Sequence, residues 1–90
     1  MELKRGKAHI ETLGREVELV ELSYRAQMEM MKAYSEDNSD VAPIMIKHGV
    51  VEFADKTIDE IATGYPFPVI IELSDAVQEF SGLNEDHEKN

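Results

Sequence analysis

The segment covering residues 65–83 carries the strongest folding signal in this chain. Its apolar side chains recur at spacings of three and four residues, so they form one stripe along about four turns of an α-helix. Pro66 and Pro68 lie where a helix start tolerates a missing N–H, and Gly82 lies where a helix end favours a positive φ. We therefore expect a helix over residues 66–82 that organises the core. The stripe consists of Val69, Ile70, Leu73, Ala76, Val77 and Phe80.

The length and composition indicate one small globular domain. The chain has 90 residues, of which 42% are hydrophobic and 31% are charged, so it has enough apolar side chains for a core. It contains no cysteine, which excludes disulfides, thiolate zinc sites and cysteine nucleophiles. No apolar run approaches the ~18 residues that a membrane span needs, and no secretory signal is apparent. We expect a cytosolic protein with no membrane partner.

The charge is strongly acidic and unevenly distributed. Nineteen acidic residues against nine basic ones give a net charge of −10. Residues 1–25 contain five of each sign, so the whole excess of acid lies in residues 26–90. Such a surface repels phosphate backbones, which argues against nucleic-acid binding, and it attracts basic partners. An acidic surface that serves solubility alone explains the same composition.

The N-terminal part predicts a β-hairpin over residues 7–22, after a flexible lead-in at residues 1–6. Gly14 and Arg15 are interpreted as a two-residue type II′ loop with glycine at its first position. Because two strands alone are marginally stable, the apolar side of the hairpin must pack on helices. In this register Ile10 lies opposite Leu19 and Thr12 opposite Val17 on the apolar side, and Glu11 opposite Glu18 and Leu13 opposite Glu16 on the solvated side.

The rest of the chain predicts four helices, at about residues 23–35, 40–54, 57–63 and 66–82. Ser23 is the expected N-cap of the first, and Thr57 with Glu60 forms a capping box for the third. Residues 50–53 fit either a short extended piece or a continued or restarted helix, and we favour the helix. Residues 84–90 are expected to form a frayed acidic tail. The fold class is thus mainly α with an N-terminal β-hairpin (α+β), in a single globular domain over residues 7–83.

The predicted first helix carries a group of methionines that could contact a partner. Met28, Met30 and Met31 lie within four residues, and Tyr34 follows on the same helix. Flexible, polarizable methionine side chains suit a surface that adapts to varied partners. These four residues are the candidate partner-binding site. An alternative is that Met28 and Met31 belong to the core, in which case Met30 is the better candidate for an exposed contact.

No pattern in the chain predicts catalysis, a cofactor or a metal site. His48 and Glu52 are spaced to share one side of a helix, but a surface ion pair between them is the favoured interpretation over metal binding. The chain has no glycine-rich phosphate loop and no serine–histidine–aspartate arrangement with supporting context. We therefore expect a protein that is not an enzyme and binds no cofactor. A small enzyme subunit or metal-binding module is the weakest of the hypotheses.

The order of features resembles the short tail assembly chaperones of long-tailed bacteriophages. The similar features are a β-type segment that runs into an "EL-S" helix start at residues 17–23, an acidic, mainly helical middle and a "Gly-Leu" element at residues 80–83. An acidic tail that closes on "Lys-Asn" at residues 88–90 is similar too. The resemblance covers the chain from about Val17 to its end. It rests on order, size and acidity rather than on one specific motif.

This resemblance implies a function without chemistry. Members of the family coat the aggregation-prone tape-measure protein and help to recruit tail-tube protein in the cytoplasm of the bacterial host. They leave before the virion matures, so this chain is not expected in the mature virion. Self-association is consistent with that role, since a scaffold along a long client would repeat head to tail.

The acidic surface supports a second hypothesis of a different class. An acidic inhibitor or DNA mimic would occupy a basic nucleic-acid-binding protein by presenting carboxylates spaced like phosphates. Glu72, Asp75 and Glu79 share the outer side of the predicted last helix, as such a row requires.

Overall fold

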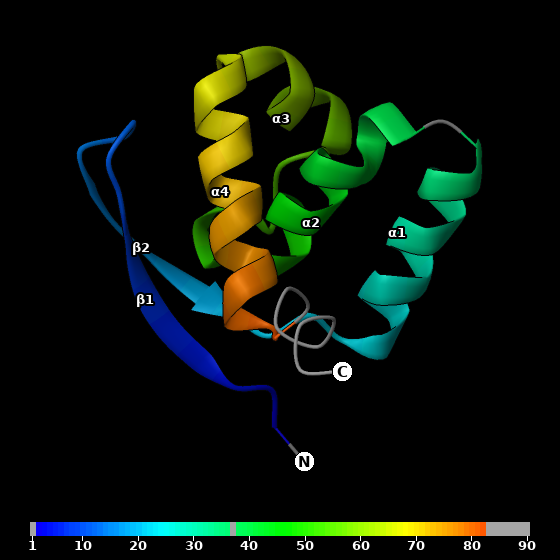
Figure 1. Ribbon diagram of the computed structural model, residues 1–90, viewed down its shortest axis with the longest axis horizontal. Helices are drawn as coiled ribbons and strands as arrows, with labels where there is room; N and C mark the ends of the chain where they lie inside the picture. The colour runs from blue at the N-terminus through cyan, green and yellow to red at the C-terminus, as the bar shows by residue number, and fades with distance from the viewer. Residues whose placement is uncertain (1, 37, 83–90) are drawn as a thin grey trace.

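The computed structural model describes residues 2–36 and 38–82 (Figure 1). A two-stranded antiparallel hairpin is followed by four α-helices, so the expected fold class is confirmed. In Figure 1 the hairpin lies along one side of α4, and α1 lies at the opposite side of the molecule, beyond α2. The elements are β1 (Arg5–Ile10), β2 (Arg15–Val20), α1 (Tyr24–Glu36), η1 (Asn38–Asp40), α2 (Val41–Gly49), η2 (Val51–Phe53), α3 (Ile58–Gly64) and α4 (Phe67–Phe80).

The last helix organises the core as its pattern predicts. Val69, Leu73 and Val77 are buried, while the flanking members of the stripe are partly buried against the same cluster. Pro66 occupies the N-cap position and Gly82 follows the helix with φ 79°. Both positions suit their residues, because proline needs no N–H donor partner at a helix start and glycine tolerates positive φ.

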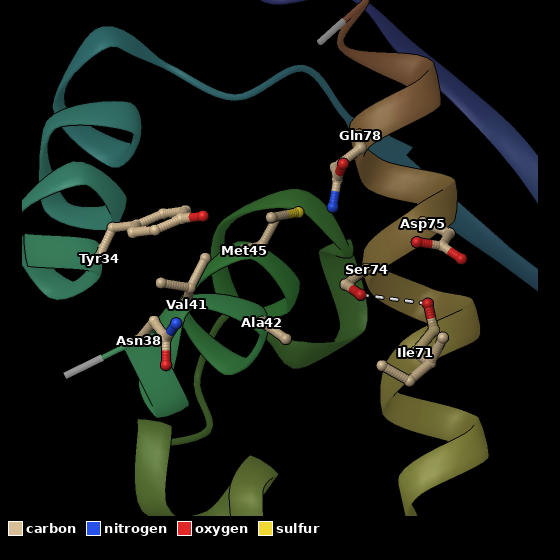
Figure 2. A pocket seen from close by; sticks show the side chains of 9 residues that line it. All are labelled: Tyr34, Asn38, Val41, Ala42, Met45, Ile71, Ser74, Asp75 and Gln78. Carbon is tan, nitrogen blue, oxygen red and sulfur yellow. Dashed lines mark hydrogen bonds between the residues drawn. The ribbon is translucent and has the colours of Figure 1, made fainter. Parts of the chain in front are cut away.

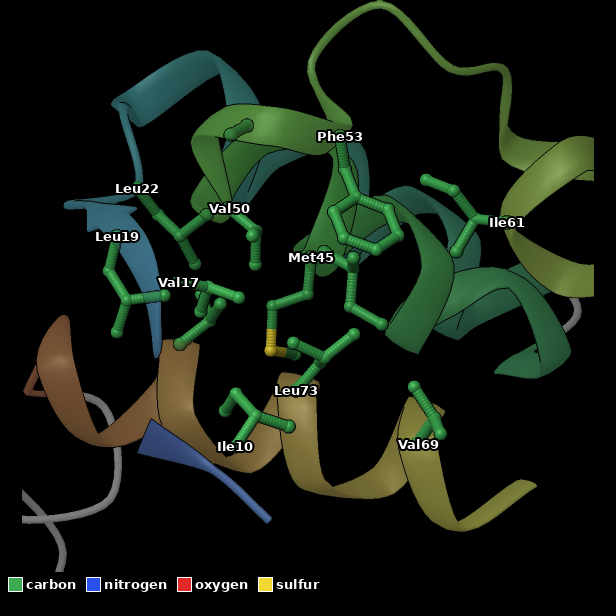
Figure 3. Packing of buried hydrophobic residues seen from close by; sticks show 13 residues of the cluster. Ile10, Val17, Leu19, Leu22, Met45, Val50, Phe53, Ile61, Val69 and Leu73 are labelled. Carbon is green, nitrogen blue, oxygen red and sulfur yellow. The ribbon is translucent and has the colours of Figure 1, made fainter. Parts of the chain in front are cut away.

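The core lies between the hairpin, α2, α3 and α4 (Figure 3). Ile10 and Leu19 are each 1% exposed, which confirms that the apolar side of the hairpin packs on the helices. Burial of this apolar surface is the main force that holds the domain together. The buried cluster consists of Ile10, Val17, Leu19, Leu22, Ala26, Met45, Ile46, Val50, Phe53, Ile61, Val69, Leu73 and Val77.

The pairing of the two strands differs from the prediction. Leu19 pairs with Gly6 rather than with Ile10, and Val17 pairs with Ala8 rather than with Thr12. The strands are joined by a four-residue turn over residues 11–14, which Gly14 closes with φ 71°. The predicted two-residue loop was therefore wrong. The register shifts by four residues, an even number, so the inward-facing side chains stay the same.

The hairpin also begins earlier than predicted. β1 starts at Arg5, so Arg5 and Gly6 belong to the strand and not to a flexible lead-in. The backbone N–H of Glu21 donates to the carbonyl of Lys4 at 2.8 Å, which extends the pairing by one step. The expected acidic tail at residues 84–90 lies outside the described residues.

The prediction of a continued or restarted helix after Gly49 is correct only in part, because the chain restarts as the short 3-10 helix η2 but does not continue helical through Val50. α2 ends at Gly49, Val50 is extended and forms an isolated bridge with Leu19, and η2 follows. Successive β-branched valines favour an extended backbone, and the bridge places the Val50 side chain in the core, where it is fully buried. The Lys47 ammonium donates to the carbonyls of Ala54 and Lys56, which stabilises the reversal of the chain.

Two of the helix starts have the predicted caps. The backbone N–H of Ala26 donates to Ser23 Oγ at 3.1 Å at the start of α1. At the start of α3 the N–H of Glu60 donates to Thr57 Oγ1, and the N–H of Thr57 donates to Glu60 Oε1. These bonds confirm the N-cap and the capping box, because each satisfies a backbone donor that the helix itself leaves free. Among the described residues, no helix combines the length and the apolar character that crossing a membrane requires.

Candidate functional site

The first helix turns its larger apolar side chains outward. Ala26 is its one buried residue, and Met30 is half-buried against the core. Met28 and Met31 are exposed, so their assignment to the core is wrong, and so is the choice of Met30 as the exposed contact. The small Ala26 side chain fits against the core where a large side chain would hold the helix away. The exposed fractions are 78% for Tyr24, 40% for Met28, 62% for Met31 and 69% for Tyr34.

A polar contact supports the packing of α1 on α2. His48 Nε2 lies 3.0 Å from Glu29 Oε1. The predicted pair between His48 and Glu52 does not form, because Glu52 instead binds Arg15 on the hairpin. Within the described part of the chain no three histidine, aspartate or glutamate side chains gather as metal ligands would.

Two adjoining hollows form a groove over α2, between the end of α1 and α4. Figure 2 shows the hollow that extends from Tyr34 to Gln78. The volumes of the two hollows are about 300 and 410 Å³, and both are lined by Asn38, Ala42 and Ile71, so they are continuous. We call this surface the α2 groove. Its remaining lining residues are Tyr34, Ser39, Val41, Pro43, Met45, Ala62, Tyr65, Phe67, Ile70, Ser74, Asp75 and Gln78.

The α2 groove is apolar with an acidic edge. Tyr34, Phe67 and Ile71 stand at its margins with 69%, 75% and 39% of their surface exposed. Among the residues that the structure describes, Asp75 is the one carboxylate of the groove, and no lysine, arginine or histidine lines either hollow. Ser74 Oγ donates to the carbonyl of Ile71 at 3.1 Å, so this hydroxyl is engaged within α4 (Figure 2). Such a surface binds apolar side chains and favours a basic neighbour beside them.

The carboxylate row on α4 is incomplete. Glu72 accepts hydrogen bonds from the backbone N–H groups of Glu11 and Thr12, at 2.8 and 3.0 Å, and from the Thr12 hydroxyl at 2.8 Å. The bonds from Thr12 and Glu11 stabilise the charged form and lower the pKa of Glu72. Glu72 thus fastens the hairpin turn to α4. Of the predicted row, Asp75 and Glu79 remain exposed without such a contact.

A second ion pair joins the hairpin to η2. The Arg15 guanidinium donates to both oxygens of Glu52, at 2.7 and 2.6 Å. This bidentate hydrogen bonding lowers the pKa of Glu52 and raises the pKa of Arg15. Both side chains are partly exposed, at 49% and 41%, so the pair contributes little to stability.

Comparisons of the chain with protein-family models, with curated proteins and with solved structures find no match. Of the four candidate contact residues, Tyr34 lines the α2 groove, whereas Met28 and Met31 lie on α1 outside it. The parts of the groove formed by α2 and α4 were not predicted. Their residues are separated by about thirty positions in the chain, and no local pattern brings them together.

Proposed function

We propose that the protein is a non-enzymatic tail assembly chaperone of a long-tailed bacteriophage, acting in the cytoplasm of the host. Its client is the tape-measure protein, and it helps to recruit tail-tube protein. The observation that supports this proposal is the α2 groove, an exposed apolar surface on a chain with a net charge of −10. Exposed apolar patches on acidic, soluble domains are typical of protein-binding sites.

The walls of the α2 groove favour a helical segment of the client over an extended one. They are built mainly from α2 and α4, with single turns of α1, η1 and α3, and the backbone donors and acceptors of α2 and α4 are mostly used within each helix. An extended peptide in the groove would lose water from its own N–H and C=O groups and find few replacements. A helix satisfies these groups itself and places side chains at positions i, i+3 or i+4 and i+7 against Ile71 and Phe67.

The charge of the groove defines the client helix further. Asp75 lies beside the apolar floor, and none of the basic side chains within residues 2–36 and 38–82 lines the groove. Lysine or arginine beside the apolar side of a client helix would be attracted to Asp75 and would meet no basic side chain in the groove. The acidic surface elsewhere keeps the bound complex soluble while the apolar parts of the client are covered.

Co-expression with a helical tape-measure fragment tests this function. We expect the fragment to stay soluble with the wild-type protein and to lose most of that solubility with Ile71→Glu, which places a carboxylate in the groove. Leu3→Glu is the matched control, since Leu3 is 45% exposed, close to the 39% of Ile71, but lies outside the groove. A fragment that is equally soluble without the protein, or equally protected by both variants, contradicts the proposal.

The DNA-mimic hypothesis predicts a different result in a second experiment. An acidic mimic, immobilised, would retain a basic nucleic-acid-binding protein from the host, and Asp75→Asn with Glu79→Gln would release it. A chaperone that binds through the α2 groove would instead retain the tape-measure fragment, and this retention would depend on Ile71. The two retained proteins are identified directly by mass.

A further inference from the structure

A second exposed surface of α1 lies outside the α2 groove. Tyr24, Met28 and Met31 are spaced at i, i+4 and i+7, so they form one stripe along the outward side of the helix. In Figure 1 this helix lies at the edge of the molecule, with the rest of the fold on one side of it. We call these three residues the α1 stripe. An apolar stripe of this kind on an isolated outer helix is typical of a helix–helix interface.

The charges beside the α1 stripe differ from those of the rest of the chain. α1 contains Arg25, Glu29, Lys32 and Glu36, so its net charge is zero, whereas the chain carries −10. Neither Arg25 nor Lys32 forms an ion pair within residues 2–36 and 38–82. The helix as a whole is therefore uncharged although the chain is acidic, and its two basic groups are free to bind carboxylates of another copy. Glu29 contacts His48 of its own chain through Oε1 and is 47% exposed, so it can also bind a base of another copy.

The order of these charges is complementary to that of a second copy of α1 that runs antiparallel to the first. Bases and acids alternate along one side of α1, and the four positions are symmetric about the middle of the helix, between Met30 and Met31. A two-fold axis at that point places Arg25 opposite Glu36 of a second copy, and Lys32 opposite its Glu29. A parallel two-fold pair would place the two charged rows on opposite sides of the interface, where they could not pair.

We propose that α1 is the interface of a symmetric antiparallel homodimer. About this axis Met28 and Met31 of one copy pack on Met31 and Met28 of the other, and the methionines adapt to the contact, while Tyr24 lies at the end of the partner helix. Each of the four charged pairs across the axis joins a base to an acid. The interface is isologous, so it closes at two copies and does not extend into a filament.

The size of the interface makes this dimer weak. A helix of 13 residues is about 20 Å long. Two such helices bury less than the roughly 1,600 Å² of a standard stable interface. The dimer therefore forms in a concentration-dependent way, and it is detected by sedimentation velocity over a range of protein concentrations. The dimer interface lies on α1, whereas the lining of the α2 groove, apart from Tyr34, lies on other elements. Formation of the dimer therefore does not depend on the proposed client.

Charge reversal on α1 tests the proposal. We expect Arg25→Glu with Lys32→Glu to raise the dimer dissociation constant by about tenfold or more, because all four charges on α1 become acidic. Glu29→Lys with Glu36→Lys should have the same effect with all four basic. An equimolar mixture of the two variants should form a heterodimer. Lys7→Glu with Lys56→Glu is the control, since it makes the same change in net charge away from α1.

Three results would overturn the proposal. The first is a wild-type protein that stays monomeric at every concentration. The second is a dimer that the α1 variants and the control weaken equally, which would indicate general repulsion. The third is a dimer that both α1 variants abolish but their mixture does not restore, which would exclude the antiparallel pairing. Circular dichroism of each variant establishes that it is folded before its association is measured.

Discussion

Truncation of Leu73 tests whether α4 is the centre of the fold. Leu73 has no exposed surface and packs in the cluster between the hairpin and α2 (Figure 3). Leu73→Ala removes most of a buried side chain and leaves a cavity within this cluster. Such substitutions cost about 2–5 kcal/mol in the free energy of unfolding. For a small domain whose total stability is about 5–15 kcal/mol, this loss is a large fraction.

Urea denaturation followed by far-UV circular dichroism measures the effect. With an m-value of about 1 kcal/mol/M, a loss of about 3 kcal/mol lowers the urea midpoint by about 3 M. Ile71→Ala is the control, since Ile71 lies two residues away on the same helix but is 39% exposed. We expect that change to cost less than about 1 kcal/mol. A Leu73→Ala loss as small as that of the control would refute the assignment of Leu73 to the core.

Two further predictions concern contacts between distant elements. The lowered pKa of Glu72 and of Glu52 adds stability that is complete above their ordinary pKa of 4.5 and is lost as the pH falls through the lower folded-state values. The free energy of unfolding should therefore decrease less between neutral and acidic pH for Glu72→Gln than for the wild type. An identical dependence on pH in the two proteins would contradict this role of Glu72. Gly49→Ala should cost about 1–3 kcal/mol, because the added Cβ would lie within 3.1 Å of Val77 Cβ and closer still to its methyl groups. Val77→Ala should recover part of that loss in a double-mutant cycle, and strictly additive losses would exclude a direct clash.

Several elements could be predicted because their signals are local. The stripe of α4, its proline start and the glycine after it lie within one segment, and helical periodicity needs no distant partner. The same holds for the caps at Ser23 and Thr57, whose bonds join residues three apart. The inward side of the hairpin was also predictable, since alternation determines the side of each residue even when the register is wrong.

The orientation of α1 was not predictable from its own pattern. Both of its sides contain apolar residues, one with Tyr24, Met28 and Met31 and the other with Ala26 and Met30. Hydrophobicity favours the larger residues for the core, yet the smaller Ala26 is the residue that is buried. Which side faces inward depends on the space that the rest of the fold leaves beside α1, and this space is not encoded within the helix.

The sequence by itself determined the fold class, the organising helix α4 and the acidic character of the surface. Three features became apparent only in the tertiary structure: the bridge between Val50 and Leu19, the hydrogen bonds from the hairpin turn to Glu72, and the α2 groove. The physical reason is separation along the chain. Glu72 and Thr12 are 60 residues apart, and Arg15 and Glu52 are 37 apart, so no short pattern records their contact. Periodicity and capping act between neighbours, whereas binding surfaces form where distant segments meet.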